Sequence, residues 1–93
     1  MTRKFEIGQV WRAKRPKPAG SLFSPAINDR QIRWVSPLGT ELQYDSPSVA
    51  PGRKYPRVSV EAFDRWAARE VTNELPENGD WASWNNDDRS KNK

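Results

Sequence analysis

The chain has 93 residues, 34% of them hydrophobic and 30% charged, with a formal net charge of +4 and neither cysteine nor histidine. A chain of this length has room for one small core, to which five tryptophans, three phenylalanines and two tyrosines contribute the largest side chains. The missing residue types exclude a disulfide framework, a thiol nucleophile and the usual zinc ligands. We therefore expect no metal, no cofactor and no enzymatic activity. We expect a cytoplasmic protein, since the sequence shows neither an apolar signal segment nor a membrane-spanning run.

The first 28 residues combine one strand signal with a long irregular segment. Apolar residues around Gly8 predict a turn or bulge at this glycine and then a strand that ends near Ala13. Residues 14–28 contain three prolines, which we expect to prevent any regular ladder or helix. Loops of this length within small domains are usually functional or disordered.

Residues 31–36 and 40–45 alternate between apolar and polar side chains, which is the pattern of two half-buried strands. The Ser-Pro-Leu-Gly sequence between them, which ends at Gly39, is typical of a tight turn. We predict a β-hairpin whose inner, apolar face includes Trp34 and Tyr44.

Residues 54–58 predict one more short strand, and Pro56 places it at a sheet edge because proline cannot donate to a ladder. Ser59 is a favourable N-cap for a helix over residues 60–72, in which apolar residues recur at steps of three and four. We expect residues 1–76 to form a single β-rich domain. Residues 77–93 are expected to form a polar, partly disordered tail.

The sequence Phe5-Glu6-Ile7-Gly8-Gln9-Val10-Trp11-Arg12, followed by a basic loop and the hairpin, resembles the opening of small SH3-like β-barrel proteins. These are frequent and mostly uncharacterised in bacteriophages and other mobile elements, and the resemblance covers about half the chain. It implies an α+β fold: a small SH3-like antiparallel β-barrel, or a curved sheet, of four to five strands with one C-terminal helix. It also implies a phage-encoded, cytoplasmic origin, but no activity, because such barrels carry unrelated functions.

Charge is divided unevenly along the chain. Residues 1–57 contain eleven Lys or Arg and four Asp or Glu, a net charge of +7, whereas residues 58–93 contain five and eight, a net charge of −3. A basic cluster attracts nucleic-acid phosphates regardless of sequence. We therefore predict nucleic-acid binding, with Trp11, Trp34 and Tyr55 adding base stacking if they face outward. The candidate phosphate-binding residues are Arg12, Lys14, Arg15, Lys17, Arg30, Arg33, Lys54 and Arg57.

Three other interpretations stay open. In the first interpretation, the basic loop is only a solvated surface. The carboxylate pairs Glu41–Asp45 and Asp87–Asp88 are then surface charge as well. The second is a phage-type protein that binds and inhibits, or redirects, a larger host protein. Its contacts would be Trp66, Trp81 and Trp84, with an acidic helix face formed by Glu61, Asp64, Glu70 and Glu74. In the third, the two tail tryptophans fold back on the sheet.

Overall fold

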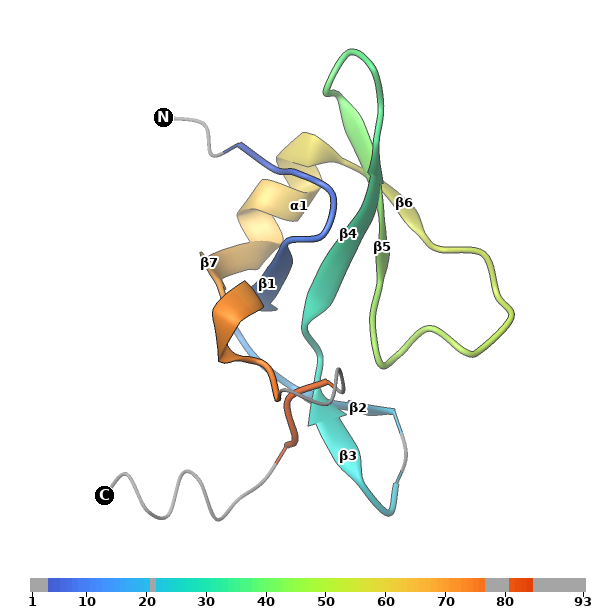
Figure 1. Cartoon of the computed structure of the whole chain (residues 1–93), viewed down its shortest axis with the longest axis vertical. Coiled ribbons are helices and arrows are strands. Elements are labelled where there is room, and N and C mark those ends of the chain that lie inside the picture. The colour runs from blue at the N-terminus through green and yellow to red at the C-terminus, as the bar shows by residue number, and fades with distance from the viewer. Residues whose placement is uncertain (1–3, 21, 77–80, 85–93) are drawn as a thin grey trace.

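The structure is a computed structural model that describes residues 4–20, 22–76 and 81–84. It confirms the α+β prediction: a five-stranded antiparallel sheet, a separate two-stranded sheet and one α-helix (Figure 1). The strands of the large sheet follow the order β6-β5-β4-β1-β7, so β6 and β7 form its two edges and the sheet is not closed. The elements are β1 (Val10–Ala13), β2 (Pro18–Gly20), β3 (Pro25–Ile27), β4 (Arg30–Val35), β5 (Glu41–Asp45), β6 (Arg57–Ser59), α1 (Val60–Trp66), β7 (Ala67–Glu70) and the 3-10 helix η1 (Thr72–Glu74).

The predicted hairpin is confirmed as strands β4 and β5. At its turn, Gly39 N donates a hydrogen bond to Ser36 O at 2.8 Å, and Gly39 has the positive φ of 72° that glycine adopts most readily. The Ser36 hydroxyl also accepts a hydrogen bond from Glu41 N at 3.1 Å. The predicted edge position is confirmed as well, because β6 pairs only with β5 within the described residues. The strand covers Arg57–Ser59 instead of residues 54–58, so Pro56 precedes it.

One residue of the hairpin departs from the prediction. Ile32 lies opposite Tyr44, but the next pair joins Trp34 to Gln43, so Arg33 is an extra residue on β4. Such a bulge reverses the alternation of faces along the strand. Trp34 therefore shares the outer face with Gln43 and is half-buried, while Val35 packs against the core in its place. The prediction of an inward-facing Trp34 is wrong.

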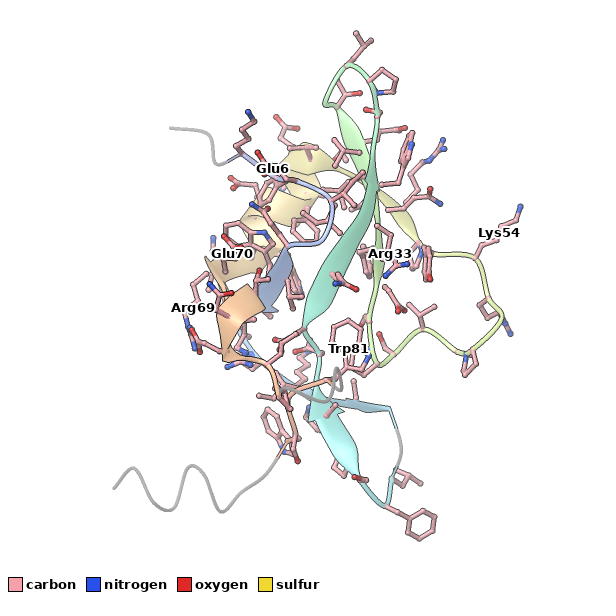
Figure 2. All side chains as sticks on the ribbon, viewed as in Figure 1. Glu6, Arg33, Lys54, Arg69, Glu70 and Trp81 are labelled. Atoms are coloured by element: carbon pink, nitrogen blue, oxygen red, sulfur yellow. The ribbon has the colours of Figure 1, made fainter. Side chains whose placement is uncertain are left out.

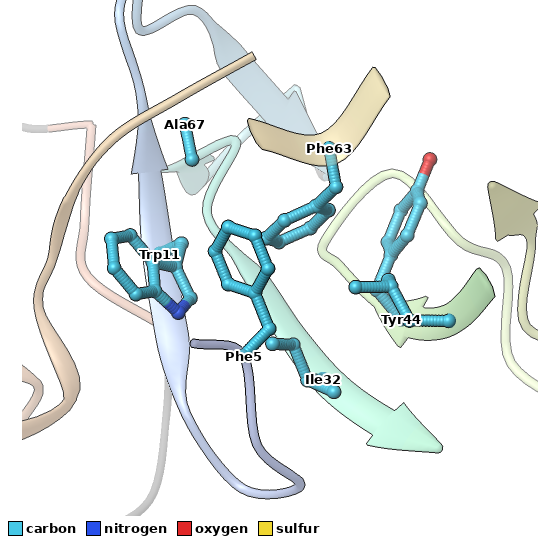
Figure 3. Close-up of a cluster of buried hydrophobic side chains, with 7 residues drawn as sticks. Phe5, Trp11, Ile32, Tyr44, Phe63 and Ala67 are labelled. Atoms are coloured by element: carbon cyan, nitrogen blue, oxygen red, sulfur yellow. The ribbon is translucent and has the colours of Figure 1, made fainter. Parts of the chain in front are cut away.

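The core lies between the inner face of the sheet and helix α1 (Figure 3). The Phe5 ring meets Trp11 and Phe63 edge-on, with centroids 5.0 and 5.1 Å apart, an arrangement that aromatic quadrupoles favour. Trp11 is only 6% exposed, so it is a core residue and not a stacking surface. The remaining buried members of this cluster are Ile32, Leu42, Tyr44 and Ala67.

Helix α1 begins as predicted but is shorter. The Ser59 hydroxyl accepts a hydrogen bond from Ala62 N at 3.0 Å, which confirms the N-cap. The helix ends at Trp66, and the chain continues as β7, paired with β1. Residues four apart share a face in both a helix and a strand, so the apolar spacing did not distinguish the two. Glu70 and Glu74 therefore lie outside the helix, and the expected acidic helix face is not formed.

The segment predicted as an irregular loop contains the hairpin of β2 and β3, which projects below the large sheet in Figure 1. Pro18 and Pro25 are the first residues of their strands, a position where proline is tolerated. Residues 81–84 lie against this hairpin: Ala26 bridges to Ser83, and Trp84 N donates to Pro25 O at 2.8 Å. The other residues of the predicted polar tail, 77–80 and 85–93, lie outside the described part of the chain.

No helix in the described ranges has the length and apolar character that crossing a membrane requires.

Candidate nucleic-acid interface

Four of the predicted phosphate-binding residues come together around one cleft. It has a volume of about 420 Å³ and lies where the end of β1, the base of the β2–β3 hairpin and the end of α1 meet. Five of its lining side chains are cationic, and none of those the structure describes is acidic. We call it the basic cleft, lined by Ala13, Lys14, Arg15, Lys17, Asn28, Arg30, Arg65 and Trp66.

The backbone at the basic cleft is fixed on both sides. Lys14 N donates a hydrogen bond to Trp66 O at 2.9 Å, which joins the chain after β1 to the end of α1. Lys17 N donates to Asn28 Oδ1, and Asn28 N donates to Lys17 O, each at 3.0 Å, so the hairpin is closed at its base. The side chains of Lys14, Arg15 and Lys17 extend from this fixed backbone and are exposed. The backbone that carries these cations is therefore already positioned before an anion binds in the cleft.

Arg30 forms one wall of the basic cleft through aromatic contacts. Its guanidinium carbon lies 4.3 Å from the centroid of Tyr44 and 4.1 Å from that of Trp66, so the cation is held against two rings. Burial lowers the pKa of the Arg30 guanidinium, which nevertheless stays charged because arginine titrates far above neutrality. Trp66, predicted as a protein-partner contact, thus belongs to the wall of this cleft.

Arg12 has a different role from the one predicted. Its Nε and Nη2 donate to Asp29 Oδ1 and Oδ2 at 2.9 and 3.0 Å, in the bidentate geometry that arginine forms with carboxylates. The Asp29 side chain is completely buried, and that of Arg12 is 17% exposed. These hydrogen bonds raise the pKa of the Arg12 guanidinium. Arg12 is therefore committed to an internal ion pair that fixes the hairpin base to β1, and it does not line the basic cleft.

Arg33 and Arg57 lie apart from the basic cleft, on the outer face of the large sheet. The Arg33 guanidinium carbon lies 5.4 Å from the Tyr55 ring centroid, and that of Arg57 lies 5.0 Å from the Trp34 ring centroid. Figure 2 shows Arg33 over the sheet, between β5 and the segment before β6. Arg57 also pairs with Glu41 at 3.7 Å, although its side chain is 57% exposed. We call Arg33, Trp34, Tyr55 and Arg57 the aromatic platform.

A larger groove adjoins the aromatic platform. It has a volume of about 850 Å³ and runs between the β2–β3 hairpin and the loop that connects β5 to β6. Lys54, the last predicted phosphate-binding residue, lines this groove together with Arg53, Tyr55 and Trp81. Lys54 and Arg53 are both exposed. We call this feature the hairpin groove.

The two tail tryptophans do fold back on the chain: both lie at the β2–β3 hairpin, and Trp81 also lines a groove together with Gln43 and Asp45 of β5 in the large sheet. Trp81 is half-buried and lines the hairpin groove. Figure 2 shows this residue near the β2–β3 hairpin. Trp84 is also half-buried, and its backbone bonds to β3. The two residues are thus built partly into the fold.

Sequence reasoning missed two residues of this region. Arg65 completes the basic cleft but comes from the acidic part of the chain, where a local charge count does not single it out. Asp29 is the partner of Arg12, and its complete burial depends on the tertiary fold alone. Comparisons with known protein families, with curated proteins and with solved structures gave no match.

Proposed function

We propose that this protein binds nucleic acid, without preference for sequence, through the basic cleft. The observation that carries the proposal is the convergence of five cationic side chains on one concave surface, with no acidic side chain among the described lining residues. Phosphate contacts of this kind give affinity but carry no sequence information. Non-catalytic binding is the whole of the proposed activity.

Electrostatics supports this reading over a merely solvated loop. Cations spread over a surface repel one another weakly, but cations gathered in a concave site concentrate their field there and attract a multivalent anion. Burial of the Arg30 guanidinium between two rings has an unfavourable desolvation free energy. No carboxylate offsets it, because Arg30 is not a member of any of the described ion pairs. A bound phosphate would supply the countercharge at this wall. Because five cations converge on the cleft, a polyanion that brings several phosphates neutralises more of this charge than a single small anion does.

The test is the salt dependence of binding. Each phosphate contact releases condensed counterions, so the logarithm of affinity falls linearly with the logarithm of salt concentration. Replacing Arg15 and Lys17 together by alanine is expected to reduce the slope by about two and to weaken all sequences alike. Fluorescence anisotropy with labelled DNA and RNA measures both quantities.

The matched control removes the same charge elsewhere. Lys4→Ala combined with Arg69→Ala changes two cations that do not line the basic cleft, and this variant is expected to keep the slope. Equal slopes for the two double variants, or no salt-dependent binding by the unaltered protein, would overturn the proposal.

The SH3-like description of the fold is part of the same proposal. It is supported by the sheet order, in which the first strand lies between β4 and the last strand, β7. The long excursion between β1 and β4, which carries most of the basic cleft, and the single helix before β7 support it too. An experimental structure with β6 and β7 hydrogen-bonded to each other would establish a closed barrel.

A second candidate function is binding to a larger host protein. It is favoured by the tip of the β2–β3 hairpin, where Leu22 and Phe23 are 95% and 99% exposed. Exposed apolar side chains on a projecting element mark interaction surfaces. A pull-down from host lysate before and after nuclease treatment separates the two functions. Capture that survives nuclease and is lost in a Leu22→Ser, Phe23→Ser variant supports a protein partner.

A further inference from the structure

We propose that the aromatic platform and the adjoining hairpin groove form a second binding surface, which takes unpaired bases of single-stranded nucleic acid. This inference rests on the proposed function and gives it a substrate class. The basic cleft contacts phosphates of any nucleic acid, whereas the platform contacts the faces of bases. Base faces are accessible only where a strand is unpaired and unstacked.

The register of the sheet places the platform on the face opposite the core. Trp34 pairs with Gln43, and Gln43 pairs with Arg57, so these three side chains lie in one row on the outer face. Their neighbours in the strands, Leu42 and Ile32, are fully buried on the other face. The bulge at Arg33 is what brings an indole ring to a surface that simple alternation would have left polar.

Each ring of the platform is matched with a guanidinium. Arg57 of β6 lies over the Trp34 ring of β4, and Arg33 of β4 lies over the Tyr55 ring just before β6, so the two cation–ring pairs both span β5. Gln43 Nε2 donates to Tyr55 O at 3.1 Å and holds the segment before β6 against the sheet. Aromatic rings and guanidinium planes are both surfaces on which bases stack, and the cations attract the connecting phosphates.

The hairpin groove continues the platform in one direction. Tyr55 and Gln43 line it on one side and Trp81 lines it on the side of the hairpin, so an aromatic ring stands on either wall. Arg53 and Lys54 supply two exposed cations on the loop beside it. Its volume of about 850 Å³ is large enough to hold a nucleotide and its neighbouring phosphates.

The inference is tested with three probes of equal length: oligo(dT), an abasic oligonucleotide with the same number of phosphates, and a DNA duplex. The unaltered protein is expected to bind oligo(dT) about tenfold or more tightly than the abasic strand, because only the former offers bases to stack. Replacing Trp34 and Tyr55 together by leucine keeps an apolar side chain at each position but removes both rings. This variant is expected to lose that tenfold advantage while its affinity for duplex stays the same.

The control variant is Phe23→Leu, which makes the same kind of replacement at an exposed ring outside the platform and the groove. It is expected to bind all three probes like the unaltered protein, and a melting curve of each variant shows that it is folded. Equal affinity of the unaltered protein for oligo(dT) and the abasic strand overturns the inference. So does a folded platform variant that retains its preference for oligo(dT). Either of these two outcomes leaves the proposed function intact, provided that the double alanine variant of Arg15 and Lys17 loses affinity for every probe.

Discussion

The three arginines at positions 12, 15 and 30 have three different environments, and these decide what each can bind. Arg12 donates two hydrogen bonds to a buried carboxylate, Arg30 lies between two rings, and Arg15 is exposed at the mouth of the basic cleft. A count of charges in the sequence treats the three as equal. Only the tertiary partners show that Arg12 contributes to stability and that Arg15 is available to a ligand.

Replacing Arg12 by methionine is expected to destabilise the protein strongly. The change leaves the fully buried Asp29 side chain without its guanidinium partner, and removing one partner of a buried ion pair typically costs about 3–5 kcal/mol. Urea unfolding measures the change in the free energy of unfolding. Arg69→Ala, which breaks an exposed pair with Glu74, is the control and is expected to cost less than about 1 kcal/mol. Similar losses for the two variants would contradict the structural role of Arg12.

The pKa of Glu74 reports the contact between η1 and β7. A hydrogen bond from Arg69 lowers the pKa of this carboxyl group below its ordinary value of 4.5. The ionised form is therefore favoured in the folded state. This contribution to stability is fully present above pH 4.5 and is lost as the pH falls through the lower folded-state pKa. Arg69→Ala is expected to raise the pKa of Glu74, measured by an NMR titration of its carboxyl carbon, whereas Arg65→Ala leaves it unchanged.

At the scale of the elements, the sequence predicted what short-range rules determine. The turn that ends at Gly39, the cap at Ser59 and the edge position of β6 depend on a few neighbouring residues, and all three are confirmed. The end of α1 was not predictable in this way, because β1 needs a partner on its second edge and β7 supplies it. The lining of the candidate site was predicted only in part: the loop cations were identified from the sequence, but Arg65 is brought to them by the fold.

The bulge on β4 gives a prediction about two aromatic residues that sequence alone does not separate. Phe63 is fully buried on the inner side of α1, so Phe63→Ala is expected to cost about 3–5 kcal/mol. Trp34 is half-buried on the outer face, and because less apolar area is lost, Trp34→Ala is expected to cost less than about 2 kcal/mol. Thermal or urea unfolding of both variants checks the order. A larger loss of unfolding free energy for Trp34→Ala than for Phe63→Ala would indicate that the Trp34 ring belongs to the core.

At the scale of the whole molecule, the division of charge in the sequence is not the division in space. Arg65, from the acidic part of the chain, joins the basic cleft, and the cations of the basic part separate into two regions. Arg30 stacks on Tyr44, a residue of the inner face, whereas Arg33 and Arg57 contact rings of the outer face. The basic cleft and the aromatic platform are thus on opposite sides of the sheet, and the β2–β3 hairpin lies at the end that both share.

This arrangement predicts how affinity depends on the length of a single strand. A short strand occupies one site at a time, but a strand long enough to pass around the hairpin end engages both, and the second contact is then intramolecular. Affinity for oligo(dT) is therefore expected to rise steeply at a threshold length and only gradually at shorter and at longer lengths. The Arg15, Lys17 double alanine variant is expected to lose this step while short strands still bind the platform. Anisotropy titrations over a series of lengths measure the effect, and Lys4→Ala with Arg69→Ala again removes two charges outside both sites as the control. An affinity that rises smoothly with length in all three proteins would show that the two surfaces do not act on one strand.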